Sequence, residues 1–319
     1  MENRQLGKDG PHLTTVGFGT WATGGAWQYG WGKQDDQDSI AAIHKAIECG
    51  VNWIDTAAVY GLGHSEKIVR AALQGMSEEI FVATKCGLAW NEQGDTKIDI
   101  RPESIRKEID RSLERLGVDV IDLYQIHWPH PKLPAEDAWS ELVKLKESGK
   151  VRYIGVSNFG LDDLSKCNAI HPVQSLQPPY SVINRVYEAK VLSYCMENGI
   201  GVVVYGPMHS GLLTGKFDVS RLAEDDWRRN SPEHTEPKLS KYLELVDKLR
   251  PIAEKYGKTI GQLAIAWTLM NPAVTAAIVG ARNARQQSEN IEGTGWRISQ
   301  EDMEEIESLH SRILGGNIS

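Results

Sequence analysis

Asp55 and Tyr60 place a carboxylate and a phenol five residues apart, in a segment that reads Trp53-Ile54-Asp55-Thr56-Ala57-Ala58-Val59-Tyr60-Gly61. An apolar run leads into Asp55 and a Gly-rich turn follows Tyr60, so Asp55 is predicted to end a strand and Tyr60 to stand in the next loop. Ser65 is expected to cap the helix that comes next. Such a carboxylate and phenol suit proton transfer. An isolated Asp and Tyr at this spacing are, however, more often part of a turn.

Two further polar residues end apolar runs later in the chain. Lys85 ends the run Val82-Ala83-Thr84-Lys85, and His127 ends the run Tyr124-Gln125-Ile126-His127. A phenol with a pKa near 10 is a poor acid at neutral pH, but a neighbouring ammonium group stabilises the phenolate and lowers that pKa. Asp55 would hold the lysine and balance its buried charge.

Each of these residues also has a simpler interpretation. A lysine at a strand end is usually a surface residue, and a histidine before Trp-Pro is more often structural. Tyr124 is a rival phenol, but it lies inside an apolar run and is expected to pack in the core. His127 and His130 have the spacing of a metal pair, yet the segment is not helical and no third ligand is near, so no metal site is predicted.

The elements that must position these side chains alternate between apolar runs and amphipathic helical patterns. Such alternation predicts parallel strands joined by crossover helices. Strands are expected over residues 16–19, 51–55, 80–85, 120–126, 153–157, 175–177, 202–205 and 276–279. Helices are expected over residues 39–49, 101–116, 135–148, 188–198, 238–256 and 259–270, and Gly50, Gly117, Gly149, Gly199 and Gly257 close several of them.

Eight such units favour a (β/α)8 barrel, that is, a TIM barrel, over a doubly wound sheet. Residues 4–7 and 13–16 flank Lys8-Asp9-Gly10 and predict an N-terminal β-hairpin that closes the bottom of the barrel. No linker or low-complexity tract interrupts the chain, so residues 1–319 are expected to form a single domain. The longest irregular stretch, residues 217–237, is expected to be functional because long loops in compact domains usually are.

Composition narrows the class of partner. With 35 Lys and Arg against 43 Asp and Glu, the formal net charge is −8, which disfavours nucleic acids and anionic membranes as partners. No signal peptide or membrane-spanning run is evident, so a cytoplasmic location is expected. The four cysteines form no C-x-x-C pair and are expected to be reduced. A small-molecule partner fits best, with the protein a monomer or weak oligomer.

Taken together, these features resemble the aldo-keto reductase superfamily. The resemblance rests on Asp-x-x-x-x-Tyr-Gly, the strand-end Lys85 and the strand-end His127, in that order. It extends through Gly17-Phe18-Gly19-Thr20-Trp21, Gly155-Val156-Ser157-Asn158-Phe159, Gln177-Pro178-Pro179-Tyr180-Ser181, Gly211-Leu212-Leu213-Thr214-Gly215-Lys216 and Ser288-Glu289-Asn290. The branch that includes the Bacillus general-stress reductases looks nearest, by Gln177-Pro178-Pro179-Tyr180 and Gly280-Ala281-Arg282.

This resemblance implies an NADP-dependent oxidoreductase acting on CH-OH groups, which reduces aldehydes and some ketones to alcohols with broad specificity. Tyr60 would donate the proton, Lys85 would lower the pKa of Tyr60, and Asp55 would hold Lys85 in place. His127, if neutral, would orient the carbonyl by a hydrogen bond.

The resemblance also implies the cofactor NADP(H), although no Rossmann G-x-G-x-x-G is present. Barrels bind phosphate through the loops after strands seven and eight. The family often has an arginine where Gln286 stands, so Arg282, alone or together with Arg285, would bind the 2′-phosphate. The residues expected to contact the cofactor are Thr20, Trp21, Asp55, Ser157, Asn158, Gln177, Tyr205, Gly206, Pro207, Gly211, Leu212, Lys216, Gly280, Arg282, Gln286, Glu289 and Asn290.

Aromatic residues in the strand-end loops are expected to form the substrate pocket, namely Trp21, Tyr60, Trp90, His127 and Trp128. Residues 208–216 and the stretch after them are candidates for a flap over the pyrophosphate.

Two other functions stay open. One is a cofactor-binding regulatory protein like the channel-associated members of the superfamily, and the other is an aldolase that forms a Schiff base on Lys85.

Overall fold

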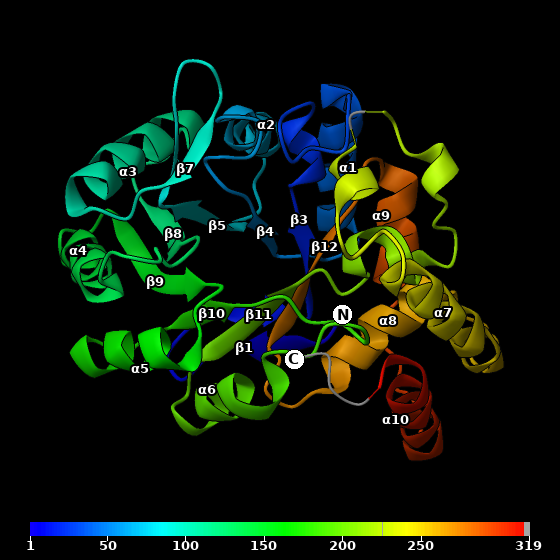
Figure 1. The fold of residues 1–319 in the computed structure, drawn as a ribbon. Helices are drawn as coiled ribbons and strands as arrows, with labels where there is room; N and C mark the ends of the chain where they lie inside the picture. Colours follow the sequence, from blue (N-terminus) through cyan, green and yellow to red (C-terminus); the bar gives the residue numbers. More distant parts are fainter. Residues whose placement is uncertain (225, 316–319) are drawn as a thin grey trace.

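A computed structural model describes residues 1–224 and 226–315. Eight parallel strands close into a barrel in the order β3, β4, β5, β8, β9, β10, β11, β12 and back to β3. These strands are β3 (Val16–Gly19), β4 (Trp53–Asp55), β5 (Phe81–Cys86), β8 (Ile121–Ile126), β9 (Val151–Ser157), β10 (Ser175–Gln177), β11 (Gly201–Tyr205) and β12 (Ala276–Gly280). Figure 1 shows the strands at the centre with the helices around them. The predicted (β/α)8 barrel is confirmed.

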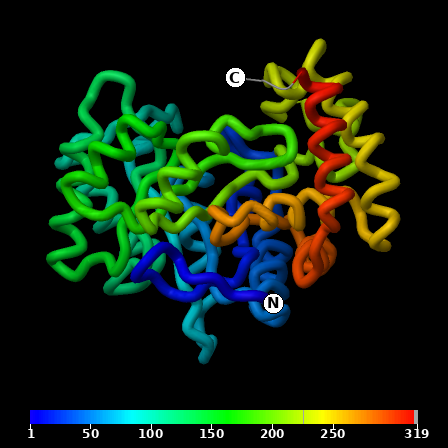
Figure 2. The backbone as a smooth tube through the Cα atoms, turned by 90° about the horizontal axis from the view of Figure 1, so that it is seen from below, coloured from blue at the N-terminus to red at the C-terminus, as the bar shows by residue number. Residues whose placement is uncertain are grey.

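Helices follow the strands as the alternating pattern predicts. They are α1 (Asp36–Glu48), α2 (His64–Leu73), α3 (Pro102–Leu116), α4 (Ala135–Glu147), α5 (Leu161–Ile170), α6 (Ser193–Glu197), α8 (Ile260–Met270) and α9 (Ala284–Ile291). Two more, α7 (Lys238–Lys255) and α10 (Gln300–Leu314), pack against each other outside this ring, as Figure 2 shows. Their apolar faces join the main core between the barrel and the helices.

Local chemistry accounts for several helix ends. The Asp35 carboxylate accepts hydrogen bonds from the first backbone N–H groups of α1, and Thr259 with Gln262 forms a capping box on α8. At the end of α3, Gly117 adopts φ 70°, a left-handed conformation that glycine takes without strain.

The predicted cap on α2 is wrong. Gly63 occupies the N-cap position, and Ser65 lies within the first turn of the helix. The Ser65 hydroxyl turns inward and donates to Thr20 Oγ1 at 2.8 Å, so this buried hydroxyl has a hydrogen-bond partner.

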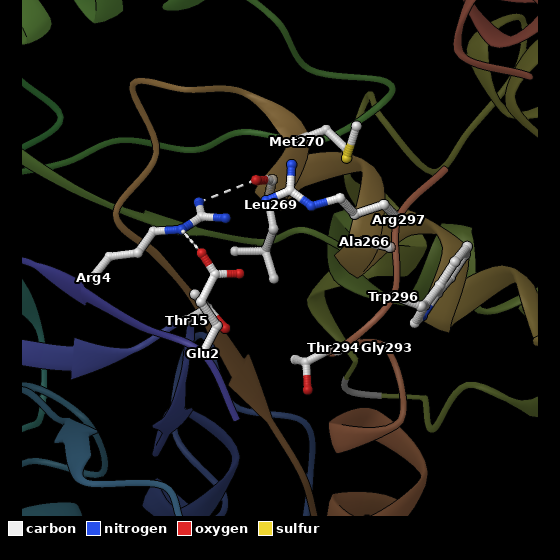
Figure 3. Close-up of a pocket in the computed structure, with 11 residues that line it drawn as sticks. Glu2, Arg4, Thr15, Ala266, Leu269, Met270, Gly293, Thr294, Trp296 and Arg297 are labelled. Carbon is white, nitrogen blue, oxygen red and sulfur yellow. Dashed lines mark hydrogen bonds and ion pairs between the residues drawn. The ribbon is translucent and has the colours of Figure 1, made fainter. Parts of the chain in front are cut away.

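The N-terminal hairpin of β1 (Asn3–Gln5) and β2 (His12–Thr14) closes the bottom of the barrel, as expected. Its Leu6 and Leu13 pack with the inward-facing residues of the strands, among them Trp53 and Leu123. Arg4 fastens the hairpin to the end of α8 by donating to the carbonyl oxygens of Leu269 and Val274 at 3.1 and 2.8 Å. Figure 3 shows this region, where a cavity of only about 30 Å³ lies beside Arg4. That cavity is lined in part by Thr15 and so lies at the amino-terminal end of the barrel strand β3.

A second hairpin, β6 (Leu88–Trp90) with β7 (Thr96–Ile98), follows β5 and was not predicted. Residues 217–224 and 226–237 are largely irregular, as expected, with short 3-10 turns at Val219–Arg221 and Trp227–Asn230. No helix among the described residues is long and apolar enough to cross a membrane.

Candidate active site

Four polar side chains meet at the carboxyl ends of neighbouring strands. Asp55 is the last residue of β4, Lys85 lies near the end of β5, His127 directly follows β8, and Tyr60 stands in the turn after β4. The parallel register of β4, β5 and β8 brings their carboxyl ends to the same rim, so residues far apart in sequence become neighbours. All four are buried.

Lys85 is the centre of this cluster. Its Nζ lies 2.7 Å from Asp55 Oδ2, 2.8 Å from the Thr56 carbonyl oxygen and 3.3 Å from the Tyr60 hydroxyl oxygen. An ammonium group has three N–H donors, and these three contacts account for all of them. Lys85 is therefore fixed in place.

Asp55 is held from two sides. Its Oδ1 accepts a hydrogen bond from Gln177 Nε2 at 2.7 Å, while its backbone carbonyl accepts one from the Thr20 hydroxyl at 3.0 Å. Burial raises the pKa of Asp55, and the Lys85 ammonium opposes that shift. Burial likewise lowers the pKa of Lys85, and Asp55 opposes it. The two groups form a buried ion pair in which each compensates the desolvation of the other.

The prediction that Lys85 lowers the pKa of Tyr60 is wrong in net direction. Burial, with a further contribution from the Asp55 carboxylate, raises the pKa of the Tyr60 phenol well above its ordinary value. Loss of water around the phenolate outweighs the ammonium group 3.3 Å away. Tyr60 is consequently protonated at neutral pH, the form that a proton donor requires.

His127 faces Tyr60 at a ring-centroid separation of 5.8 Å, edge to face. Burial and, to a smaller extent, the positive charge of Lys85 lower the pKa of His127 well below its ordinary value. The imidazole is therefore neutral at physiological pH and can donate one N–H.

Aromatic rings cover the cluster on the outer side. Trp21 stacks on Tyr60 at 6.1 Å, Trp27 lies 6.2 Å from the same ring, and Trp90 belongs to the same apolar cluster. Trp128, also predicted for the pocket, is 40% exposed at the rim. Trp227, from the long stretch after β11, stacks on Trp21 at 6.2 Å with only 5° between the ring planes. Trp227 was not predicted, because nothing in the local sequence distinguishes a stacking tryptophan in an irregular segment.

Several residues that are predicted to contact the cofactor also converge. Asn158 Nδ2 lies 3.0 Å from Ser157 Oγ, and Asn158 Oδ1 accepts from the Tyr205 hydroxyl at 2.8 Å. Gly160 occupies the N-cap position of α5, so neither Ser157 nor Asn158 caps that helix. Gln177 lies beside them, since its backbone carbonyl accepts the Ser157 hydroxyl at 2.8 Å.

The predicted phosphate-side residues follow β12. Arg282 lies just before α9, its backbone N–H donates to Gln286 Oε1 at 2.9 Å, and Asn290 donates to the carbonyl of Gly280 at 3.1 Å. Arg285 is mostly exposed and forms an ion pair with Glu289, one turn later on α9, at 3.4 Å.

The remaining predicted cofactor residues follow β11. Gly206 and Gly211 adopt positive φ, Pro207 and Leu212 are buried, and Lys216 is exposed. Leu212 is fully buried and packs in the main core.

Residues 15–311 match the Aldo/keto reductase family. The chain belongs to this family. It is 37% identical over 313 residues to the aldo-keto reductase YhdN of Bacillus subtilis, covering 97% of this chain and 93% of that protein. The chain is also 35% identical over 317 residues to the NADH-specific methylglyoxal reductase of Escherichia coli, covering 95% of this chain and 96% of that protein. Among solved structures, the glycerol dehydrogenase AKR11B4 of Gluconobacter oxydans superposes with a TM-score of 0.90 at 38% identity, covering 99% of this chain and 97% of that one. The family is one of nicotinamide-dependent oxidoreductases.

Proposed function

We propose that this aldo-keto reductase is a single-domain enzyme that reduces aldehydes and some ketones to alcohols with NADPH. The observation that carries the proposal is the buried cluster of Asp55, Lys85, Tyr60 and His127, in which an ion pair lies 3.3 Å from a protonated phenol. Such a cluster is costly to bury and is retained where a proton must be delivered.

The four side chains divide the work. A bound reduced nicotinamide supplies the hydride that forms the new C–H bond at the carbonyl carbon. His127 donates its N–H to the carbonyl oxygen and so fixes the orientation of the substrate. Tyr60 transfers its proton to the same oxygen, where the π-bond electron pair has moved, and becomes a phenolate. Lys85 stabilises that phenolate, and Asp55 keeps Lys85 charged and in place until Tyr60 regains a proton from water.

The described residues fit a nicotinamide dinucleotide by the chemistry of their donors. Ser157, Asn158 and Gln177 supply hydroxyl and amide groups beside the aromatic ring of Tyr205, which suits the carboxamide and ring of nicotinamide. At the other end, Arg282 and the first N–H groups of α9 suit a phosphate. Over residues 1–224 and 226–315, no carboxylate pairs with Arg282. A half-buried guanidinium without a carboxylate supports the preference for NADPH over NADH.

The fixed state of Lys85 disfavours the aldolase alternative. Its three N–H donors are all used within the cluster, whereas a Schiff base needs a neutral amine open to the substrate carbonyl. An enzyme and a cofactor-binding regulatory protein would make the same contacts with the cofactor. Only turnover of a carbonyl substrate distinguishes the two functions.

The aromatic cover of the cluster supports substrates with an apolar or small body. Trp21, Trp90 and Trp128 would line the entrance and Trp227 would close it from the long loop. Because the relatives named above act on methylglyoxal and glycerol, we include small oxygenated carbonyl compounds among the substrates of this pocket.

A turnover assay tests the proposal. The protein is mixed with a reactive aldehyde such as methylglyoxal and with NADPH or NADH, and oxidation of the cofactor is followed by absorbance. We expect sustained turnover with a higher kcat/KM for NADPH. Binding of NADPH without turnover would favour the regulatory function, and a higher kcat/KM for NADH would overturn the cofactor assignment.

A further inference from the structure

Arg282 is held by a segment nearly 250 positions earlier in the chain. The loop between β3 and α1 places Gln34 beside it, and Arg282 Nε donates to Gln34 Oε1 at 2.8 Å. Arg282 Nη2 donates to the carbonyl of Lys33, and Gln34 Nε2 donates back to the carbonyl of Arg282 at 2.8 Å. Gln34 thus binds both the side chain and the backbone of Arg282.

These contacts use one edge of the guanidinium and leave the other free. A guanidinium has five N–H donors, and the loop takes one on Nε and one on Nη2. Within the described part of the chain, Nη1 has no hydrogen-bond acceptor. The two N–H groups of Nη1 and the second one of Nη2 therefore form a fork that can accept two oxygens of a phosphate.

Both partners on the occupied edge are neutral, so the charge of Arg282 stays uncompensated. Other part-buried arginines near the site differ, since Arg115 pairs with Glu66 at 2.5 Å and Arg228 pairs with Asp226 at 2.6 Å. A neutral amide aims the guanidinium without cancelling the attraction for an anion.

We propose that Gln34 is a positioning residue that preorganises Arg282 for the 2′-phosphate of the cofactor and so sets the preference for NADPH. The proposal rests on the proposed function, which assigns that phosphate to Arg282. An unrestrained arginine loses rotamer entropy when it binds a phosphate, and a guanidinium already fixed by Gln34 and Lys33 avoids most of that loss. Gln286 completes the support by holding the backbone N–H of Arg282.

The test measures binding by calorimetry with 2′,5′-ADP and 5′-AMP, which differ only in the 2′-phosphate and carry no nicotinamide. We expect Gln34→Ala to weaken 2′,5′-ADP by about tenfold and to leave 5′-AMP unchanged. Gln34→Glu keeps an acceptor for Nε but pairs its charge with Arg282, so it should weaken 2′,5′-ADP more than Gln34→Ala does.

Gln37→Ala is the matched control, because Gln37 is exposed on α1 and its side chain makes no hydrogen bond among the described residues. It should leave both affinities unchanged. Unchanged or tighter binding of 2′,5′-ADP by Gln34→Ala would overturn the proposal, and tighter binding would show that Gln34 competes with the phosphate. If the unsubstituted protein binds 2′,5′-ADP no better than 5′-AMP, the NADPH assignment itself fails, which is a separate result.

Discussion

At the scale of single residues, the buried ion pair of Lys85 and Asp55 is the main electrostatic feature of the site. Its geometry is tight, with Gln177 satisfying the second carboxylate oxygen at 2.7 Å. Hydrogen bonds of this kind reduce the desolvation penalty, but a buried pair still contributes little net stability compared with apolar residues of the same size. We therefore attribute the pair to chemistry and not to folding.

Removing one partner of the pair should separate these two roles. Lys85→Met leaves a buried carboxylate without its cation and should lower the free energy of unfolding by about 3–5 kcal/mol. The double variant Lys85→Met with Asp55→Asn removes both charges and should recover most of that loss while remaining inactive. Urea unfolding and steady-state kinetics check both statements. Turnover near the unsubstituted level in the double variant would mean that Tyr60 does not need Lys85.

At the scale of elements, α3 supports the end of β5 through a buried carboxyl group. Glu108 Oε2 accepts the backbone N–H of Gly87 at 3.0 Å, two residues after Lys85. Burial is the largest cause that raises the pKa of Glu108, to about 7. Because the unfolded state releases this proton at a lower pH than the folded state does, Glu108 destabilises the fold progressively as pH rises from about 4.5 to about 7.

Glu108→Gln removes this titration. We expect the stability difference between the variant and the unsubstituted protein to shift in favour of the variant by about 3 kcal/mol between pH 4.5 and pH 7.5. Unfolding by urea at several pH values measures the difference, which cancels the groups that both proteins share. A difference that does not depend on pH would show that Glu108 titrates normally.

The long segment after β11 is a second element with a defined task. Arg228 donates to the carbonyl of Ser210 at 3.1 Å and lies over the ring of Trp31 at 5.0 Å, which holds Trp227 against Trp21. This places an aromatic ring from a distant loop at the outer edge of the predicted pocket.

Trp227→Ala should weaken the binding of bulky aldehydes more than that of small ones. The loss of one stacking contact between Trp227 and the ring of an aromatic aldehyde, about 1 kcal/mol, corresponds to a rise of roughly fivefold in KM for that aldehyde. Methylglyoxal has no ring, so its KM should be nearly unaffected. Trp227→Phe keeps a ring and serves as the control. An equal change in KM for both substrates would place Trp227 outside the substrate pocket.

At the scale of the whole molecule, the apolar residues that close the barrel and the polar residues of the candidate active site lie at opposite ends of the strands. The N-terminal hairpin packs Leu6 and Leu13 into the bottom layer of the core, whereas the polar cluster lies at the carboxyl ends of the strands. Because the hairpin covers the bottom of the barrel, the carboxyl ends of the strands can hold buried charged side chains while the bottom stays closed to solvent.

Leu6→Ala tests the division. Deleting a fully buried leucine side chain should lower the free energy of unfolding by about 2–5 kcal/mol. Measured well below the unfolding temperature, kcat should stay the same, because the cavity forms far from Tyr60. A large loss of kcat in a folded variant would show that the two ends are coupled.

The barrel was predictable because its signals are periodic and repeated. Apolar runs and closing glycines such as Gly117 and Gly149 recur around it, and a polar residue at a strand end must lie on the common rim. Features that depend on packing were not predictable. Ser65 turned inward to Thr20, and Trp227 found its partner in Trp21 across more than two hundred positions. The pKa of Tyr60 was misjudged for the same reason, since burial cannot be read from neighbours in the sequence.

The most direct test of the account compares Tyr60→Phe with the unsubstituted protein. Phenylalanine keeps the ring that stacks on Trp21 and removes only the hydroxyl group. The measurement is single-turnover oxidation of bound NADPH by an aldehyde, together with the Kd for NADPH from tryptophan fluorescence. We predict a loss of at least about a hundredfold in the rate with Kd nearly unchanged. A rate close to that of the unsubstituted protein would contradict the assignment of Tyr60 as the proton donor.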